Sequence, residues 1–239
     1  MKNIIATSLI LILNITLLFS QSGKVTYIAT INDKPISQGD SNSIEKKNIV
    51  DLIAANSKDV EFELVFNDIE SIYNKKEVLK KDSDKSFNFT ALLAGGDTTF
   101  YTNKQELQCI KAIEDGGTNF LISINPTKWT ITNETKKIDN YICYKAFTKI
   151  KTLVNDEIRE KKVIAWFTKE IPIFFGPKLY YGLPGLIIEL YDNKLLLKVS
   201  KIELNIKKNI IIKRPSKGEK VTQKEYEEIL KKMDFDDGY

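Results

Sequence analysis

Histidine is absent from the 239-residue sequence, and this absence narrows the chemistry open to the protein. Serine and cysteine hydrolases that depend on a histidine base are excluded, and so are zinc sites of the HExxH type. Only two cysteines are present, too few to complete a zinc or copper centre without histidine. We therefore expect no metal and no cofactor, and any catalysis would have to use carboxylate, lysine, tyrosine or cysteine side chains.

Concentrated charge of one sign is also lacking. The 36 basic and 32 acidic residues leave a formal net charge of only +4, and the basic residues are dispersed along the chain. Proteins that bind nucleic acid usually gather lysine and arginine on one face. Lysines do gather between Asn74 and Ser86, but acidic residues are interleaved with them, which predicts a solvated loop. We expect no nucleic-acid partner.

Long apolar runs are scarce, and the run from Ile4 to Phe19 is the longest. It is short for a bilayer span, it follows a lysine, and small polar residues come after it, which is typical of a cleaved signal peptide. No cysteine stands near the cleavage point to carry a lipid anchor. We expect residues 1–20 to be removed near Ser20, leaving residues 21–239 as a single β-rich domain, periplasmic or secreted, with no membrane span.

Short alternating apolar segments are abundant, and this pattern is typical of β-strands. We expect strands at residues 24–31, 61–66, 69–73, 98–102, 106–112, 119–124, 129–132, 141–150, 163–168, 186–191, 195–202 and 206–213. No helix-length segment separates the strands from residue 98 onward, which excludes parallel βαβ units and favours an antiparallel meander. A sheet of this length must curl or close to protect its edges.

Two segments have helical periodicity. An apolar stripe preceded by a serine predicts a helix over residues 44–55. Near the end of the chain, Thr222 and Glu225 form a capping box, and apolar residues follow at helical spacing up to Met233. The expected fold is therefore mainly β: a large curved antiparallel sheet with one internal helix and a C-terminal helix. This outline resembles the half-barrel of the lipoprotein-carrier proteins, in which a helix plugs the concave face.

The densest group of aromatic, proline and glycine residues lies between Trp166 and Leu190. Its motifs are Trp166-Phe167-Thr168, Glu170-Ile171-Pro172, Gly176-Pro177 and Gly182-Leu183-Pro184-Gly185-Leu186-Ile187. These motifs resemble those of the GLPGLI family, exported proteins of Bacteroidota-type bacteria whose activity is uncharacterised. The residues themselves predict a shaped connection between two strands, in which Gly182 or Gly185 adopts a positive φ and Pro184 directs the chain into the next strand.

The aromatic residues of this stretch allow two interpretations: they line a ligand cavity or docking patch, or they form core beneath the connection. In an extended chain, the neighbouring rings of Phe174 and Phe175, and those of Tyr180 and Tyr181, point to opposite sides, so some aromatic surface should remain exposed. The expected ligand or partner surface consists of Trp166, Phe167, Glu170, Phe174, Phe175, Tyr180 and Tyr181.

These features favour a non-enzymatic, exported binding or envelope-assembly module. Its partner would be an apolar small molecule, a lipid or an envelope protein. The alternative is a cofactor-free hydrolase that uses carboxylates, with Glu170 as the acid and Glu134 or Glu189 as its partner. That mechanism requires two of these acids to converge within about 10 Å across an open cleft.

The two cysteines, Cys109 and Cys143, each fall within an expected strand. In an oxidising compartment the natural expectation is a disulfide between them. Such a bond would stabilise the fold by roughly 3 to 4 kcal/mol according to the loop-entropy model. The alternative is two separate buried thiols, and the distance between the strands decides between these outcomes.

Overall fold

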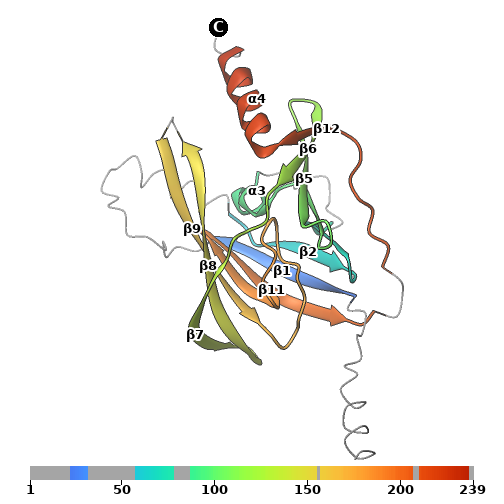
Figure 1. Ribbon diagram of the computed structural model, residues 1–239, viewed down its shortest axis with the longest axis vertical. Helices are drawn as coiled ribbons and strands as arrows, with labels where there is room; N and C mark the ends of the chain where they lie inside the picture. The colour runs from blue at the N-terminus through green and yellow to red at the C-terminus, as the bar shows by residue number, and fades with distance from the viewer. Residues whose placement is uncertain (1–21, 32–56, 78–86, 155–156, 207–209, 237–239) are drawn as a thin grey trace, which may run out of the picture.

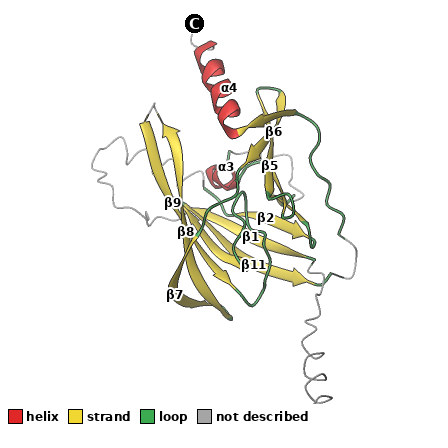
Figure 2. Cartoon of the chain, viewed as in Figure 1, coloured by secondary structure: helices red, strands yellow, loops and turns green. Residues whose placement is uncertain are grey.

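A single large sheet dominates the computed structural model, which describes residues 22–31, 57–77, 87–154, 157–206 and 210–236 (Figure 1). Its strands are β1 Gly23–Ile31, β2 Val60–Phe66, β3 Glu70–Lys75, β4 Thr99–Asn103, β5 Gln108–Asp115, β6 Thr118–Ile124, β7 Thr130–Ile138, β8 Tyr141–Val154, β9 Glu157–Thr168, β10 Leu186–Asp192, β11 Leu195–Leu204 and β12 Glu219–Thr222. The helices of the described part are α3 Phe89–Ala94 and α4 Gln223–Asp236 (Figure 2).

The strand order is β12-β6-β5-β4-β3-β2-β1-β11-β10-β9-β8-β7, and every described neighbouring pair is antiparallel except β12 and β6. The chain therefore runs through β1 to β6 on one half of the sheet and through β7 to β11 on the other half, and the halves join where β1 pairs with β11. The sheet curves so that β8 and β9 stand opposite β5 and β6 (Figure 1). The predicted mainly β fold with a large curved sheet is confirmed.

The main core lies on the inner side of this curve, and period-2 alternation explains which residues reach it. In β2, Phe62, Leu64 and Phe66 are completely buried, whereas the residues between them are half-buried. Burial of each such side chain contributes roughly 1.5 to 3 kcal/mol. Tyr27 of β1 is also completely buried, and its hydroxyl donates to the Ile187 carbonyl at 2.9 Å. The core therefore fastens the Gly-Leu-Pro-Gly-Leu-Ile segment to the middle of the sheet.

The segment after β11 differs from its prediction. Residues 210–213 were expected to complete a strand, but they form no strand. Ile212 is instead buried against the side chains of β4, β5 and β6, because the chain crosses the outside of the sheet here. This crossing brings β12 to the far edge, where it pairs in parallel with β6. The apolar residues that suggested a strand therefore serve to attach the crossing segment.

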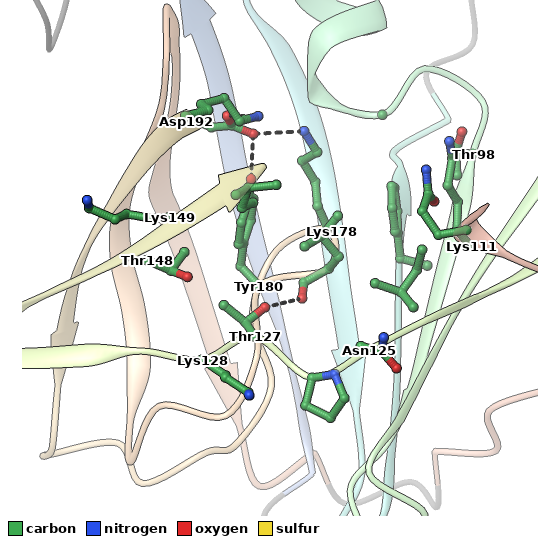
Figure 3. Close-up of a pocket in the computed structure, with 18 of the residues that line it drawn as sticks. Thr98, Lys111, Asn125, Thr127, Lys128, Thr148, Lys149, Lys178, Tyr180 and Asp192 are labelled. Atoms are coloured by element: carbon green, nitrogen blue, oxygen red, sulfur yellow. Dashed lines mark hydrogen bonds and ion pairs between the residues drawn. The ribbon is translucent and has the colours of Figure 1, made fainter. Parts of the chain in front are cut away.

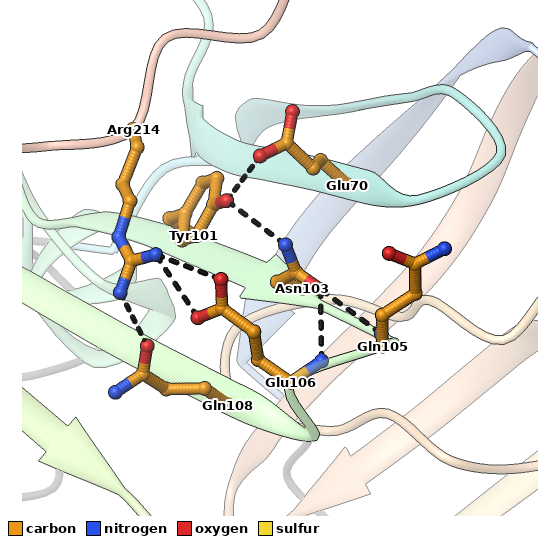
Figure 4. Close-up of polar contacts among 7 residues, drawn as sticks. All are labelled: Glu70, Tyr101, Asn103, Gln105, Glu106, Gln108 and Arg214. Atoms are coloured by element: carbon orange, nitrogen blue, oxygen red, sulfur yellow. Dashed lines mark hydrogen bonds and ion pairs between the residues drawn. The ribbon is translucent and has the colours of Figure 1, made fainter.

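Arg214 fixes the crossing segment to the sheet (Figure 4). Its guanidinium makes two contacts with the Glu106 carboxylate, at 3.1 and 2.9 Å, and donates to Gln108 Oε1 at 2.6 Å. The guanidinium carbon also lies 5.6 Å from the ring centroid of Tyr101, whose hydroxyl donates to Glu70. This cluster places β12, and with it the start of α4, beside β6.

The predicted C-terminal helix is confirmed as α4, and its capping box is formed. The Thr222 N–H donates to Glu225 Oε2 at 2.7 Å, and the Glu225 N–H donates to Thr222 Oγ1 at 3.2 Å. Tyr226 packs edge-to-face on Phe120 of β6 with ring centroids 5.3 Å apart, and its hydroxyl donates to Asp115 at 2.6 Å. Neither described helix is long and apolar enough to cross a membrane.

Helix α3 was not predicted, and with six residues it is too short to show helical periodicity. Asn88 caps it, since Asn88 Oδ1 accepts from the Thr90 and Ala91 N–H groups, and Gly95 ends it with a φ of +128°. The helix expected at residues 44–55 and the leader expected at residues 1–20 lie outside the described residues.

The connection from β9 to β10 needs its glycines for two different reasons. Gly182 has a φ of +93°, so the expected positive φ is confirmed at this glycine, and its N–H donates to the Phe174 carbonyl at 2.9 Å. Gly185 has an ordinary φ, but a Cβ there would overlap the backbone carbonyl of Thr168, and one at Gly176 would overlap that of Tyr180. The connection is therefore folded tightly on itself rather than extended.

The predicted disulfide between Cys109 and Cys143 is wrong, because both cysteines are free and completely buried. Their strands, β5 and β8, are separated in the sheet by β4, β3, β2, β1, β11, β10 and β9. Cys143 Sγ has its own contact with the Tyr141 carbonyl, at 3.9 Å. Burial raises the pKa of the Cys109 thiol to about 12 and that of the Cys143 thiol to about 11, so both stay protonated and unreactive at neutral pH.

We therefore expect both cysteines to resist a thiol reagent such as iodoacetamide in the folded protein at pH 7.5. After denaturation in guanidinium chloride, both should be alkylated without any reductant. The measurement is the intact mass before and after each treatment. A chain that gains mass from alkylation only after reduction would show that the disulfide exists and that this placement of the strands is incorrect.

The glycines give a second prediction. In Gly182→Ala, the added methyl contacts only the Phe174 ring at 3.9 Å, so the cost is the positive φ, about 1 to 2 kcal/mol. At roughly 2 to 4 °C per kcal/mol, the melting temperature should fall by about 2 to 8 °C. Gly117→Ala is the matched control for the cost of a positive φ alone. Gly117 has a φ of +76°, and nothing lies within 4 Å of an added Cβ.

Gly185→Ala should lower the melting temperature more than either of these variants, because backbone atoms must move to accommodate its methyl group. Thermal unfolding followed by circular dichroism measures all three. If Gly185→Ala melts like the unmodified protein, the tight approach of Gly185 to Thr168 is not a constraint on the fold.

Candidate functional site

A cavity of about 860 Å³ lies between the two halves of the curved sheet (Figure 3). This volume falls within the range of roughly 300 to 1,000 Å³ that is common for small-molecule sites. The lining comes from both halves of the sheet, from α3, from the β6–β7 and β9–β10 connections and from the start of α4. Its residues are Leu92, Leu93, Gly95, Thr98, Phe100, Lys111, Ile113, Ile124, Asn125, Pro126, Thr127, Lys128, Thr130, Phe147, Thr148, Lys149, Ile150, Lys161, Lys178, Leu179, Tyr180, Asp192, Gln223 and Glu227.

The wall of the cavity is more apolar than polar. Leu93 and Phe100 contribute from the side of α3 and β4, and Ile113 contributes from β5. Leu92 lines the cavity while 56% of its surface remains exposed, so the cavity extends to the surface of the protein at α3. A ligand with a substantial apolar part could therefore enter and be sheltered from water.

Two connections that are far apart in sequence are joined at one end of the cavity. Thr127 Oγ1, in the β6–β7 connection, donates to the Leu179 carbonyl at 3.1 Å. Trp129 Nε1 donates to the Tyr181 carbonyl at 2.9 Å, and the Trp129 ring lies 6.1 Å from that of Tyr180. The folded β9–β10 connection, which carries the Gly-Leu-Pro-Gly motif, therefore forms part of the cavity wall.

Asp192, at the end of β10, is a buried carboxylate with three partners. One oxygen lies 2.5 Å from Lys161 Nζ. The other lies 3.2 Å from Lys178 Nζ and accepts from the Tyr180 hydroxyl at 2.8 Å (Figure 3). Burial alone would raise the pKa of Asp192, but the two ammonium groups outweigh it and lower this pKa below its ordinary value. Asp192 therefore stays ionised and pairs with both lysines, and its single negative charge balances one of their two positive charges. Lys178 Nζ also donates to the Leu93 carbonyl at 3.0 Å, which attaches α3 to the same group.

Lys111 differs from the other cavity lysines near it. It lies on β5 between Cys109 and Ile113 in the strand alternation, on the side of the strand that faces the cavity. Among the described residues, it forms no ion pair with any carboxylate, and its ammonium lies 5.3 Å from the ring centroid of Tyr226. Burial lowers the pKa of Lys111, and the neighbouring Lys178 lowers it further.

The three acids of the hydrolase alternative line neither this cavity nor a second one of about 570 Å³ beside β12. Each has its own partner: Glu170 accepts from the Ile142 N–H at 3.0 Å, Glu134 pairs with Lys145 at 2.9 Å, and the buried Glu189 pairs with Lys136 at 2.7 Å. Within the described ranges, no group of three or more Cys, Asp or Glu side chains is placed to hold a metal ion.

The seven residues expected to form the ligand or partner surface do not share one face. Phe167, Phe175, Tyr180 and Tyr181 are buried, and of the seven only Tyr180 lines the cavity. Tyr180 and Tyr181 are both buried because the connection folds back on itself, whereas Phe174 stays half-buried beside the buried Phe175. Trp166 is half-buried on the outer side of β9, where Lys136 Nζ lies 4.4 Å from its ring centroid.

Sequence reasoning missed the cavity lysines and Asp192. A signal for Lys111 was present, because it interrupts an otherwise apolar alternation from Cys109 to Ile113. Asp192 follows a run of apolar residues and lies just beyond the strand expected at residues 186–191. Nothing in the sequence indicates that Lys161 and Lys178 approach it, since that contact depends on how the β9–β10 connection folds.

Comparisons with known proteins give a short family match. A family model described as "Protein of unknown function (Porph_ging)" matches residues 151–189, which include β9, the connection and the whole Gly-Leu-Pro-Gly-Leu-Ile motif. This match overlaps the stretch on which the GLPGLI resemblance rests, and it does not test that family name. Comparison with curated proteins gives no match.

Three solved structures are similar in part. Two are structures of PNGF-II, in the P21 and C2 space groups, with 15% and 16% identity, TM-scores of 0.49 and 0.48, and alignments that cover 87% and 88% of this chain. This chain spans only about a third of the PNGF-II length, 33% and 32%. The third is LprF from Mycobacterium bovis, with 10% identity, a TM-score of 0.31, and coverage of 82% of this chain and 90% of LprF. All three likenesses are remote, so the argument for function rests on the cavity itself.

Proposed function

We propose that this protein is an exported binding protein that holds an apolar ligand in the cavity between the two halves of its sheet. One observation carries this proposal: a cavity of about 860 Å³, walled by side chains from both halves, reaches the surface beside α3. Protein interiors are close-packed, and each unfilled apolar space forfeits contacts that would stabilise the fold. A bound apolar ligand would restore those contacts, which gives the space a physical reason to exist.

Export is part of the proposal. It is supported by the apolar run Ile4 to Phe19 and by the resemblance of the Gly182 to Ile187 motif to a family of exported proteins. The two free thiols are compatible with an oxidising compartment, because Cys109 and Cys143 are buried on strands far apart in the sheet.

A cavity-filling substitution tests this function. Thr148 of β8 is buried and lines the cavity, so Thr148→Phe should place a ring where the ligand would lie. We expect the unmodified protein to bind the neutral apolar dye N-phenyl-1-naphthylamine saturably, with a stoichiometry near one. Thr148→Phe should weaken this binding at least tenfold. The measurement is a fluorescence titration of the dye.

Thr135→Phe is the matched control, because Thr135 lies exposed on β7 and does not line the cavity. It should bind the dye like the unmodified protein. Circular dichroism and thermal unfolding show whether both variants are folded. Absence of saturable binding by the unmodified protein, or equal binding by a folded Thr148→Phe, would refute the proposed function.

A further inference from the structure

We propose that the ligand of this cavity is an anionic amphiphile, an acyl chain that ends in a carboxylate, and that Lys111 binds its charged group. This inference rests on the proposed function and specifies its ligand. Three features support it: the position of Lys111, its lack of a protein counter-ion and the character of the surrounding wall.

The position of Lys111 is unusual for a lysine. The neighbouring residues on the same side of β5, Cys109 and Ile113, are apolar, and Ile113 lines the cavity with Lys111. A lysine at such a position on a half-buried strand costs folding free energy, since its ammonium loses part of its hydration. Pairing with an opposite charge would offset this loss of hydration, so a lysine on an apolar wall indicates a site for an anion.

The described part of the protein places no carboxylate in ion-pair contact with Lys111, and the Asp115 carboxylate on the same strand only partly opposes the effect of burial and of Lys178 on its pKa. Asp192 pairs with both Lys161 and Lys178, and Glu160 pairs with Lys149 at 2.7 Å. Within the described ranges, Lys111 has no carboxylate within ion-pair distance, and its contact with the Tyr226 ring is weak in comparison.

The lining of the cavity also carries more positive than negative charge. Among the described side chains, five lysines line it against two carboxylates, those of Asp192 and Glu227, so the formal charge of this part of the lining is +3. A ligand anion beside Lys111 would supply the missing counter-ion. Burial and Lys178 both lower the pKa of Lys111, because they disfavour its charged form. A bound anion would raise this pKa, because it favours the charged form.

The rest of the lining indicates the remainder of the ligand. Leu93, Phe100 and Ile113 offer an apolar surface on the same side as Lys111, which suits an acyl chain. Among the residues whose side chains the structure describes, no arginine lines the cavity, so the two-point pairing that a guanidinium makes with an anion is not offered by these residues. The ammonium of Lys111 is a point charge on an apolar part of the wall, and a carboxylate, with one negative charge on a compact group at the end of the chain, matches it.

Displacement of bound N-phenyl-1-naphthylamine at pH 7.5 tests the inference with three competitors of equal chain length: hexadecanoate, hexadecanol and 1-palmitoyl-lysophosphatidylglycerol. We expect hexadecanoate to displace the dye at a concentration at least tenfold lower than hexadecanol or the lysophospholipid. Lys111→Met keeps an apolar side chain of similar reach and removes the charge. This variant should need at least a tenfold higher concentration of hexadecanoate to displace the dye, whereas the concentration of hexadecanol needed should stay the same.

Lys137→Met is the control, because Lys137 is exposed on β7 and does not line the cavity, and it should keep the full preference for hexadecanoate. Equal displacement by the acid and the alcohol, or a folded Lys111→Met that keeps the preference, would overturn the role of Lys111 while leaving apolar binding intact. Stronger displacement by the lysophospholipid would overturn the assignment of a carboxylate. Failure of the dye itself to bind refutes the proposed function instead, so the two failures are distinguishable.

Discussion

The buried carboxylate of Asp192 joins the parts of the structure that surround the cavity. It pairs with Lys161 of β9 and with Lys178 and Tyr180 of the β9–β10 connection, and Lys178 also holds the end of α3 through the Leu93 carbonyl. Removing one member of a buried ion pair typically costs about 3 to 5 kcal/mol, because a charge is left without a partner. Since the folded pKa of Asp192 is below its unfolded value of about 3.9, its stabilising contribution is complete above that pH. It is lost as the pH falls through the lower folded pKa.

The cavity follows from this arrangement and from the curvature of the sheet. A flat sheet would hold β5 and β8 far apart, whereas the curved one places both beside the same space (Figure 1). The β9–β10 connection stays in the wall because Gly182 and Gly185 permit its tight folding and because Trp129 and Thr127 bond to its carbonyls. The glycine-proline motif therefore has an architectural role that reaches the candidate site. Lys111 is a half-buried lysine of this wall that has no ion-pair partner among the described residues.

Much of the fold could be predicted from local patterns, and the site could not. Period-2 alternation located eleven of the strands, and the capping box at Thr222 located α4, because both signals lie within a few neighbouring residues. Residues 210–213 have the apolar content of a strand, but they pack on the outside of the sheet, and only the path of the chain distinguishes the two cases. The cysteines were paired from their expected compartment, whereas both thiols are free and each is buried on its own strand. Asp192, Lys161 and Lys178 meet only through the folding of a connection, which no local pattern encodes.

The most direct test of the central claim, that the cavity holds an anionic amphiphile, is the ligand content of the protein purified from its own cells without detergent. Native mass spectrometry would compare the mass of the intact complex with that of the denatured chain, and fragmentation would identify any molecule released. The structure predicts one bound molecule per chain, with an acyl chain and a carboxylate. A chain that carries no ligand under conditions that preserve non-covalent complexes, or one that carries only neutral or water-soluble molecules, would contradict this account.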